Sequence, residues 1–236
     1  MQEKFLVKNI FSTEEKLRVC DSVHKLKEHW INRGGYFAYP FFSLGAASYM
    51  DAREDQSRYY QWAKKFNPLL EAEFAWLYTK IQDWLQTELG KEVKYHPKQA
   101  LPGFHIFLGD ELFEIPVASR HVDLQYRDLD WGDLKYKPED SLSFTAYIKL
   151  PANGGGMSVW DYSHQDLLEL DPLAREAKLS AAESKYQKFQ EGDIVIHSGL
   201  HYHQIAPMEE PTEEDQRISL QGHAVLADDG SYQLYW

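Results

Sequence analysis

The chain has 236 residues, of which 43% are hydrophobic and 14% aromatic, and this composition predicts a folded protein with a substantial core. Its formal net charge of −12 argues against nucleic acid as a partner, because phosphate backbones are bound by clustered lysine and arginine. The single cysteine, Cys20, excludes an intramolecular disulfide and any metal site built from several cysteines. No apolar run is long enough to span a bilayer and residues 1–4 open no apolar signal region, so we expect no membrane partner and a cytoplasmic protein.

The N-terminal part, residues 1–95, is expected to be mainly helical and to pack on the outside of the remaining chain. A capping-box pattern predicts a helix from Ser12 to about Trp30. Apolar residues at three- and four-residue steps predict a second helix from Asn67 to just before Gly90. The aromatic segment 36–60 between them is weakly periodic and indicates a long packed loop. This loop is either a lid over a substrate or simple packing of the helices on the core.

The C-terminal part, residues 96–236, consists of short β-rich runs separated by Gly, Pro and Asp turns, a pattern typical of a sandwich or barrel. A polar stretch near 165–190 predicts a helical insertion. No linker divides the chain, so we expect a single domain covering 1–236. The predicted strands are Phe104–Leu108, Val122–Tyr126, Ser143–Leu150, Met157–Trp160, Asp193–Ser198, Ile218–Leu226 and Tyr232–Tyr235.

The predicted strand Val122–Tyr126 overlaps a possible metal-binding pair of residues. His121 and Asp123 are two residues apart, and side chains on a strand alternate between its faces, so both would point the same way. A further histidine from a distant strand would complete three ligands. Two imidazoles and one carboxylate on one face of a metal, with the other positions open, are the ligand set of non-haem Fe(II) oxygenases.

Three histidines compete for the third position. All three have odd residue numbers and therefore share one parity along the chain. Strand alternation therefore does not choose between His201 and His203. A histidine that is not a ligand would serve as a hydrogen-bond donor beside the metal or in a substrate pocket.

An arginine and a serine follow downstream, in the sequence Arg217-Ile218-Ser219. The planar guanidinium offers a fork of donors and the serine a hydroxyl, which together suit a carboxylate. A simple surface role for Arg217 is disfavoured because the strand continues with apolar residues.

The set His121-x-Asp123, distal His203 and Arg217-x-Ser219 resembles the motifs of the Fe(II)- and 2-oxoglutarate-dependent dioxygenases. The resemblance covers about residues 100–236 and implies a mainly β fold with flanking helices around a double-stranded β-helix, the jelly-roll core shared with cupins. The turn Asn153–Gly156 fits this pattern. One departure is the long stretch between His203 and Arg217, which carries an acidic insert.

The resemblance also implies roles for individual residues. His121, Asp123 and His203 would bind Fe(II); His203 is preferred over His201 because an apolar residue and then Pro207 follow it, as in the family. Arg217 would pair with the far carboxylate of 2-oxoglutarate, and Ser219 would add a hydrogen bond. Tyr147 and His105 would either make further contacts with 2-oxoglutarate or around the metal, or serve as packed structural residues.

The activity implied is oxidation of a small molecule with Fe(II), 2-oxoglutarate and O₂, releasing succinate and CO₂. We expect hydroxylation of a small polar metabolite such as an amino acid or a derivative. Because Asp123 stands where related halogenases have Gly or Ala, hydroxylation is favoured over halogenation. The alternatives are desaturation, demethylation or cyclisation with the same cofactors, and a non-catalytic cupin-like binding protein. The sequence identifies neither the substrate nor the oligomeric state.

Overall fold

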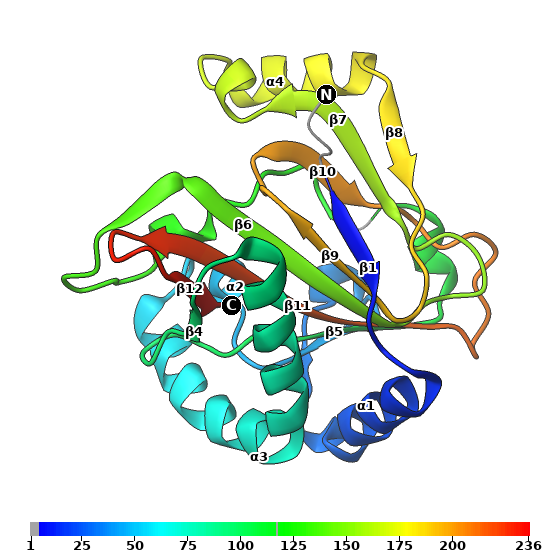
Figure 1. The fold of residues 1–236 in the computed structure, drawn as a ribbon. Coiled ribbons are helices and arrows are strands. Elements are labelled where there is room, and N and C mark those ends of the chain that lie inside the picture. The colour runs from blue at the N-terminus through cyan, green and yellow to red at the C-terminus, as the bar shows by residue number, and fades with distance from the viewer. Residues whose placement is uncertain (1–4, 117) are drawn as a thin grey trace.

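The strands of this computed structural model, which describes residues 5–116 and 118–236, form two sheets (Figure 1). The large sheet has the order β1-β9-β6-β11-β5-β3-β2, and β12 joins it beside β11 and next to β4. The small sheet has the order β10-β7-β8. The strands of the large sheet are β1 (Leu6–Asn9), β2 (Ile31–Asn32), β3 (Phe41–Leu44), β4 (Val93–Tyr95), β5 (Gly103–Leu108), β6 (Tyr136–Lys149), β9 (Asp193–His197), β11 (Gln216–Ala227) and β12 (Tyr232–Tyr235). Those of the small sheet are β7 (Met157–Ser163), β8 (Ser184–Gln187) and β10 (His201–Ile205).

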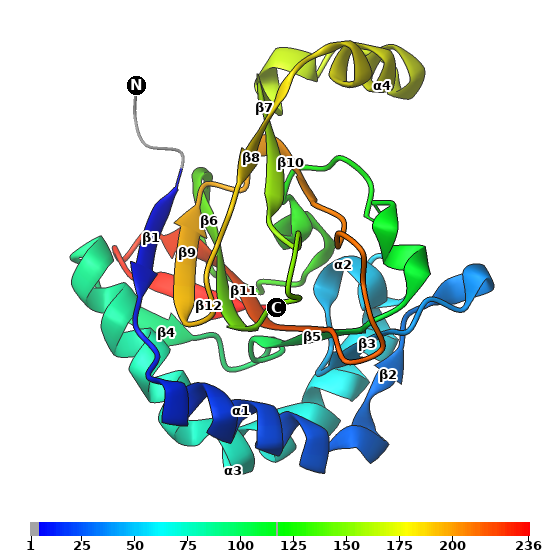
Figure 2. The ribbon, with the colours of Figure 1, turned by 90° about the vertical axis from the view of Figure 1, so that its right-hand side faces the viewer.

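Two long helices cover the outer face of the large sheet (Figure 2). They are α1 (Thr13–Lys25) and α3 (Gln56–Leu89); two shorter helices, α2 (Ser48–Asp51) and α4 (Pro172–Ala181), lie elsewhere. Single 3-10 turns are η1 (Lys27–His29), η2 (Gly35–Phe37), η3 (Glu111–Glu114), η4 (Gln125–Asp128) and η5 (Gln165–Leu167). No helix in the described part of the chain combines the length and the apolar character needed to cross a membrane.

The alternation of side chains on β11 separates the core from the site. Ile218 and Leu220 belong to the hydrophobic core, together with apolar side chains of α1 and α3. The odd-numbered residues Arg217, Ser219 and His223 therefore point to the opposite, inner face of the sheet. The predicted jelly-roll class is confirmed. On β11, the side chains of one face belong to the hydrophobic core, and the polar side chains of the other face lie at the site.

The helix predicted from Asn67 begins eleven residues earlier. Asp55 caps α3 by accepting a hydrogen bond from the backbone N–H of Arg58, and Pro68 lies inside the helix. A proline inside a helix removes one backbone hydrogen bond. Here the apolar face continues on both sides of it, with Tyr59 and Leu70 both fully buried, and the packing of that face maintains the helix through Pro68.

Strands also occur in the N-terminal part, where we expected helices. β1 pairs with β9, and β3 pairs with β5, so residues of this part extend the large sheet at both of its edges. The segment 36–60 is not a continuous loop: it contains η2, β3, α2 and the start of α3. Near 165–190 the chain forms η5, α4 and β8, and α4 projects from one end of the molecule (Figure 1).

The prediction of a strand at Val122–Tyr126 is wrong. Only His121 makes a β-bridge, and the chain then turns into η4. The β-rich composition of this run indicated extended backbone, but Asp123 donates its N–H to the carbonyl of Gly199, 2.7 Å away, and the pairing does not continue. His121 and Asp123 are positioned by two separate backbone contacts instead of by one strand.

Candidate metal centre

His121 and His203 are held together by their backbones. His203 lies on β10, and His121 pairs with it through two hydrogen bonds, N to O, of 3.0 and 2.9 Å. The centres of their imidazole rings are 4.4 Å apart. The contact between Asp123 and Gly199, in the loop that precedes β10, brings the carboxylate to the same place. Three side chains from two distant segments are thus fixed by main-chain hydrogen bonds.

Both histidines turn the same ring nitrogen toward the carboxylate. Nδ1 of His121 lies 2.8 Å from the carbonyl oxygen of Ser119, and Nδ1 of His203 lies 2.9 Å from that of His201. A carbonyl oxygen only accepts, so each Nδ1 carries the proton and each Nε2 has a free lone pair. The Nε2 atoms are 3.8 and 3.5 Å from the two oxygens of Asp123. Such a neutral imidazole is the form that binds a metal.

Burial favours this neutral form at His203. The ring is 5% exposed, and burial lowers its pKa to about 3 although Asp123 acts in the opposite direction. His121 is more open to the cavity described below. The possible ligand atoms of His121, Asp123 and His203 lie within 4.8 Å of one another, which is the separation expected of groups that share one ion. His201 is not part of this group, so the geometry favours His203 as the distal ligand.

The carboxylate of Asp123 is oriented by side chains that sequence analysis missed. Ser143 Oγ lies 2.6 Å from Oδ2, and Gln125 Nε2 lies 2.9 Å from Oδ1. Because a carboxylate only accepts, Ser143 donates its hydroxyl proton to Asp123. His223 Nδ1, 2.9 Å from the same hydroxyl, must then donate to Ser143. The result is a buried chain of hydrogen bonds that ends at Asp123.

The parity of β11 could have placed His223 on the same face as Arg217, whereas Ser143 lies on β6 and depends on the register between the two strands. His223 has the same parity as Arg217, and the register pairs it with Ser143 on β6 and Tyr235 on β12. The missing information was the register itself, which the sequence does not give. Ser143 is also aligned with His197 on β9.

His197 is a buried neutral histidine beside the group. It accepts a hydrogen bond from the N–H of Gly199 at Nδ1, 3.1 Å away, so its proton is on Nε2. Burial lowers its pKa to about 4. Its ring centre is 5.0 Å from that of His203. In this tautomer His197 is a donor toward the cavity and not a metal ligand.

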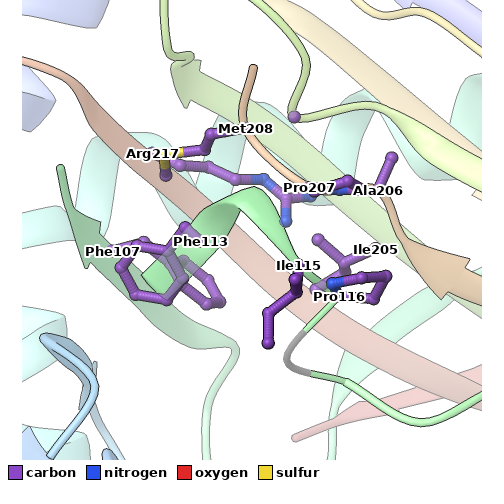
Figure 3. Close-up of a pocket in the computed structure, with 10 residues that line it drawn as sticks. Phe107, Phe113, Ile115, Pro116, Ile205, Ala206, Pro207, Met208 and Arg217 are labelled. Atoms are coloured by element: carbon purple, nitrogen blue, oxygen red, sulfur yellow. The ribbon is translucent and has the colours of Figure 1, made fainter. Parts of the chain in front are cut away.

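Arg217 is buried without an acidic partner among the described residues. Its side chain is 2% exposed, and none of its three guanidinium nitrogens has a hydrogen-bond partner among the described residues. The guanidinium lies over the rings of Phe107 and Tyr147, 5.7 and 5.5 Å from their centres. Figure 3 shows the side chain extending into a small pocket next to Met208, with Phe107 also in its wall. An unpaired buried charge is costly, so this arrangement fits an anion that completes the site.

The other residues predicted to surround the anion lie on strands next to Arg217. Ser219 is fully buried, its hydroxyl has no partner among the described residues, and the register places it between His105 on β5 and Tyr147 on β6. Burial raises the pKa of Tyr147 to about 12, so it remains a neutral phenol. His105 Nε2 lies 2.8 Å from the hydroxyl of Tyr49, whereas its Nδ1 has no partner in the described chain.

A cavity of about 590 Å³ opens in front of the three possible ligands. Residues of the large sheet, such as Ser143 and His223, and residues of the small sheet, such as Met157 and Ile205, line it from opposite sides. Phe107 and Ile205 also line the small pocket of Arg217, so the two spaces are neighbours. The segment 36–60, which the sequence left as either a lid or packing, contributes wall residues: Tyr39, Phe41, Tyr49, Met50 and Arg53.

Comparison with known proteins gives similarity in structure only. No protein-family model matches the chain, and no curated protein sequence matches it. An N-substituted L-amino acid dioxygenase from Burkholderia ambifaria AMMD, also solved in complex with α-ketoglutarate, superposes with a TM-score of 0.62 at 15% identity over 99% of this chain and 86% of that one. The chain has the fold of the Fe(II)- and 2-oxoglutarate-dependent oxygenases.

Two further structures support the same assignment of fold. EctD from S. alaskensis, solved with bound Fe, gives a TM-score of 0.51 at 12% identity, covering 93% of this chain and 72% of that one. The α-ketoglutarate-dependent carbocyclase SnoK from nogalamycin biosynthesis gives 0.51 at 12% identity, covering 95% and 83%. The fold predicted from the motifs is therefore confirmed, while the amino acid dioxygenase and the carbocyclase are named for different reactions.

Proposed function

We propose that this protein is an Fe(II)- and 2-oxoglutarate-dependent oxygenase that hydroxylates a small polar metabolite such as an amino acid or an amino acid derivative. The observation that carries the proposal is the pairing of two incomplete sites in adjoining spaces. One is the set of two Nε2 lone pairs and a carboxylate formed by His121, His203 and Asp123. The other is the buried guanidinium of Arg217, which has no acidic partner among the described residues.

The donor set fits the cofactors. Two neutral imidazoles and one carboxylate suit a divalent iron that keeps further positions open. Arg217, with the Ser219 hydroxyl beside it, would bind the far carboxylate of 2-oxoglutarate through charge-assisted hydrogen bonds. When bound, iron and 2-oxoglutarate supply the oxidising chemistry, in which O₂ is consumed and succinate and CO₂ are released.

The residues of the chain itself bind, orient and exclude water. Ser143 and Gln125 fix both oxygens of Asp123, so the carboxylate keeps one orientation toward the two histidines. Tyr147 and Phe107 cover Arg217 and keep solvent from the guanidinium, which strengthens its attraction for a carboxylate. The side chain of His121 is the most solvent-exposed of the three proposed ligands and would face the incoming substrate.

The test is a panel of amino acids and their derivatives, incubated with the protein, Fe(II), 2-oxoglutarate and O₂. We expect at least one compound to stimulate succinate release and to gain one oxygen atom by mass spectrometry. Loss of two hydrogen atoms from the same compound would indicate desaturation or ring closure instead. Fe(II) and 2-oxoglutarate that do not bind to the protein at all would contradict the proposal as a whole.

A further inference from the structure

Two arginines on the wall of the large cavity have no acidic partner among the described residues, although Arg127 lies over the ring of Tyr126, 5.8 Å from its centre. Arg53 and Arg127 both line the cavity, and neither makes a hydrogen bond or an ion pair with any residue that the structure describes. By contrast, Arg33 on the same wall forms two hydrogen bonds with Asp51, of 2.7 and 2.8 Å. The chain carries 37 acidic against 25 basic residues, so a cation has many possible partners. Two arginines that line one cavity and have no acidic partner in the described chain are suited to bind an anionic group of a ligand.

The two arginines come from neighbouring elements. Arg53 lies between α2 and α3, and Arg127 lies in η4, four residues after the proposed ligand Asp123. The side chain of Gln56, in the first turn of α3, donates a hydrogen bond of 3.0 Å to the carbonyl of Asp128. This contact connects the two segments at the edge of the cavity. Both arginine side chains are exposed, so they are open to a ligand.

The charges around this pair leave it positive. Arg33 is neutralised by Asp51. Asp128, next to Arg127, is the other acidic side chain on the wall besides the proposed ligand Asp123, and it forms no ion pair with either arginine. Among the side chains that line the cavity, this edge carries two guanidinium groups and one carboxylate, in a chain whose total charge is −12.

Part of the remaining cavity wall is suited to an apolar body. Phe41 and Phe107 stack with their ring centres 4.3 Å apart, and the apolar side chains of Leu124, Met157 and Ile205 also line the cavity. A volume of about 590 Å³ lies in the range of cavities that enclose small metabolites. The cavity therefore combines one cationic edge with a group of apolar wall residues, beside polar ones such as Thr145 and Gln221.

We infer that the substrate is a carboxylic acid with an apolar body, and that Arg53 and Arg127 bind its carboxylate while the apolar part extends toward His121, Asp123 and His203. The inference rests on the proposed function and names its substrate class. Arg53 and Arg127 determine specificity: they bind a part of the substrate remote from the metal and so set which carbon approaches it. The carboxylate bound here is distinct from the one assigned to Arg217.

The experiment uses the protein loaded anaerobically with Fe(II) and 2-oxoglutarate. The probes are apolar L-amino acids and their N-acetyl derivatives, each paired with the carboxamide of the same skeleton, and binding is measured by isothermal titration calorimetry. We expect acids to bind and their amides to bind on the order of tenfold more weakly, which corresponds to one charge-assisted contact. Arg53→Gln and Arg127→Gln should each reduce this preference for the acid. Arg58→Gln is the matched control, because Arg58 pairs with Glu54 and does not line the cavity.

Three results would overturn the inference: no acid of the panel binds, amides bind as tightly as acids, or both arginine variants retain the full preference. None of these affects the proposed function as long as the protein still binds Fe(II) and 2-oxoglutarate. If instead the wild type fails to bind the two cofactors, the proposed function fails first. Circular dichroism of each variant separates a loss of binding from a loss of folding.

Discussion

Ser143 and His223 face each other across β6 and β11, with Ser143 Oγ and His223 Nδ1 2.9 Å apart, and together they orient Asp123. The serine hydroxyl donates to the carboxylate at 2.6 Å. The chain of donors leaves the carboxylate as the final acceptor, which holds it ionised and in a fixed orientation.

Replacing Ser143 by Ala should weaken Fe(II) binding by about 10- to 100-fold, because groups that orient a metal ligand contribute this much to affinity. The measurement is Fe(II) titration under anaerobic conditions, with thermal unfolding as a control for folding. Ser141→Ala, a change at a buried serine on the same strand whose hydroxyl has no partner in the described chain, should leave affinity unchanged. Equal affinities for wild type and Ser143→Ala would show that the hydrogen bond to Asp123 is not needed.

His203→Ala should abolish Fe(II) binding, whereas His201→Ala should retain it. The reason is geometric: Nε2 of His203 lies 3.5 Å from Asp123, and the group of possible ligands does not include His201. The carbonyl of His201, which accepts from Nδ1 of His203, is preserved in the alanine variant. Retention of iron by His203→Ala together with its loss in His201→Ala would reverse the assignment.

Arg217→Ala should raise the concentration of 2-oxoglutarate needed for turnover and leave Fe(II) affinity nearly unchanged. The guanidinium lies apart from the three proposed ligands, in its own small pocket. Removing one partner of a buried charged pair costs about 2 to 4 kcal/mol, and about 1.4 kcal/mol corresponds to a tenfold change. An unchanged requirement for 2-oxoglutarate would mean that another cation binds its far carboxylate.

Asp51→Ala should destabilise the protein, because it leaves Arg33 with an uncompensated charge. The Arg33 side chain is 9% exposed and that of Asp51 is fully buried, and the carboxylate also accepts from the N–H of Ala47. Breaking a buried pair of this kind costs about 3 to 5 kcal/mol in the free energy of unfolding. Glu54→Ala, which removes the exposed partner of Arg58, should cost less than about 1 kcal/mol. Similar urea midpoints for the two variants would contradict this difference.

Residue patterns predicted the fold class and named side chains that the structure places close together. Parity on β11 was sufficient to place Arg217 and Ser219 on one face, because a long strand with a regular core side repeats every two residues. The His121 and Asp123 pair was identified for a reason that the structure corrects: the two residues do not share a strand, and each is fixed by a backbone contact with a distant segment.

The parts of the site that sequence did not predict depend on pairing between distant segments. Ser143 meets Asp123 only through the register of β6 and β11 and the loop before β10. Tyr49 and Arg53 reach the cavity because α2 packs next to η4, and no local pattern in residues 36–60 specifies that contact. Strand register and packing between elements are properties of the assembled fold, so composition and periodicity alone do not predict them.

The most direct test of the central claim is an anaerobic titration of the protein with Fe(II) and then 2-oxoglutarate, followed by visible absorption. A chelate of 2-oxoglutarate on iron held by two imidazoles and a carboxylate has a weak charge-transfer band. We predict this band for the wild type, its absence in Asp123→Ala and His203→Ala, and its appearance in Arg217→Ala only at higher 2-oxoglutarate concentrations. A wild-type protein that binds Fe(II) and yet shows no such band with saturating 2-oxoglutarate would contradict the account.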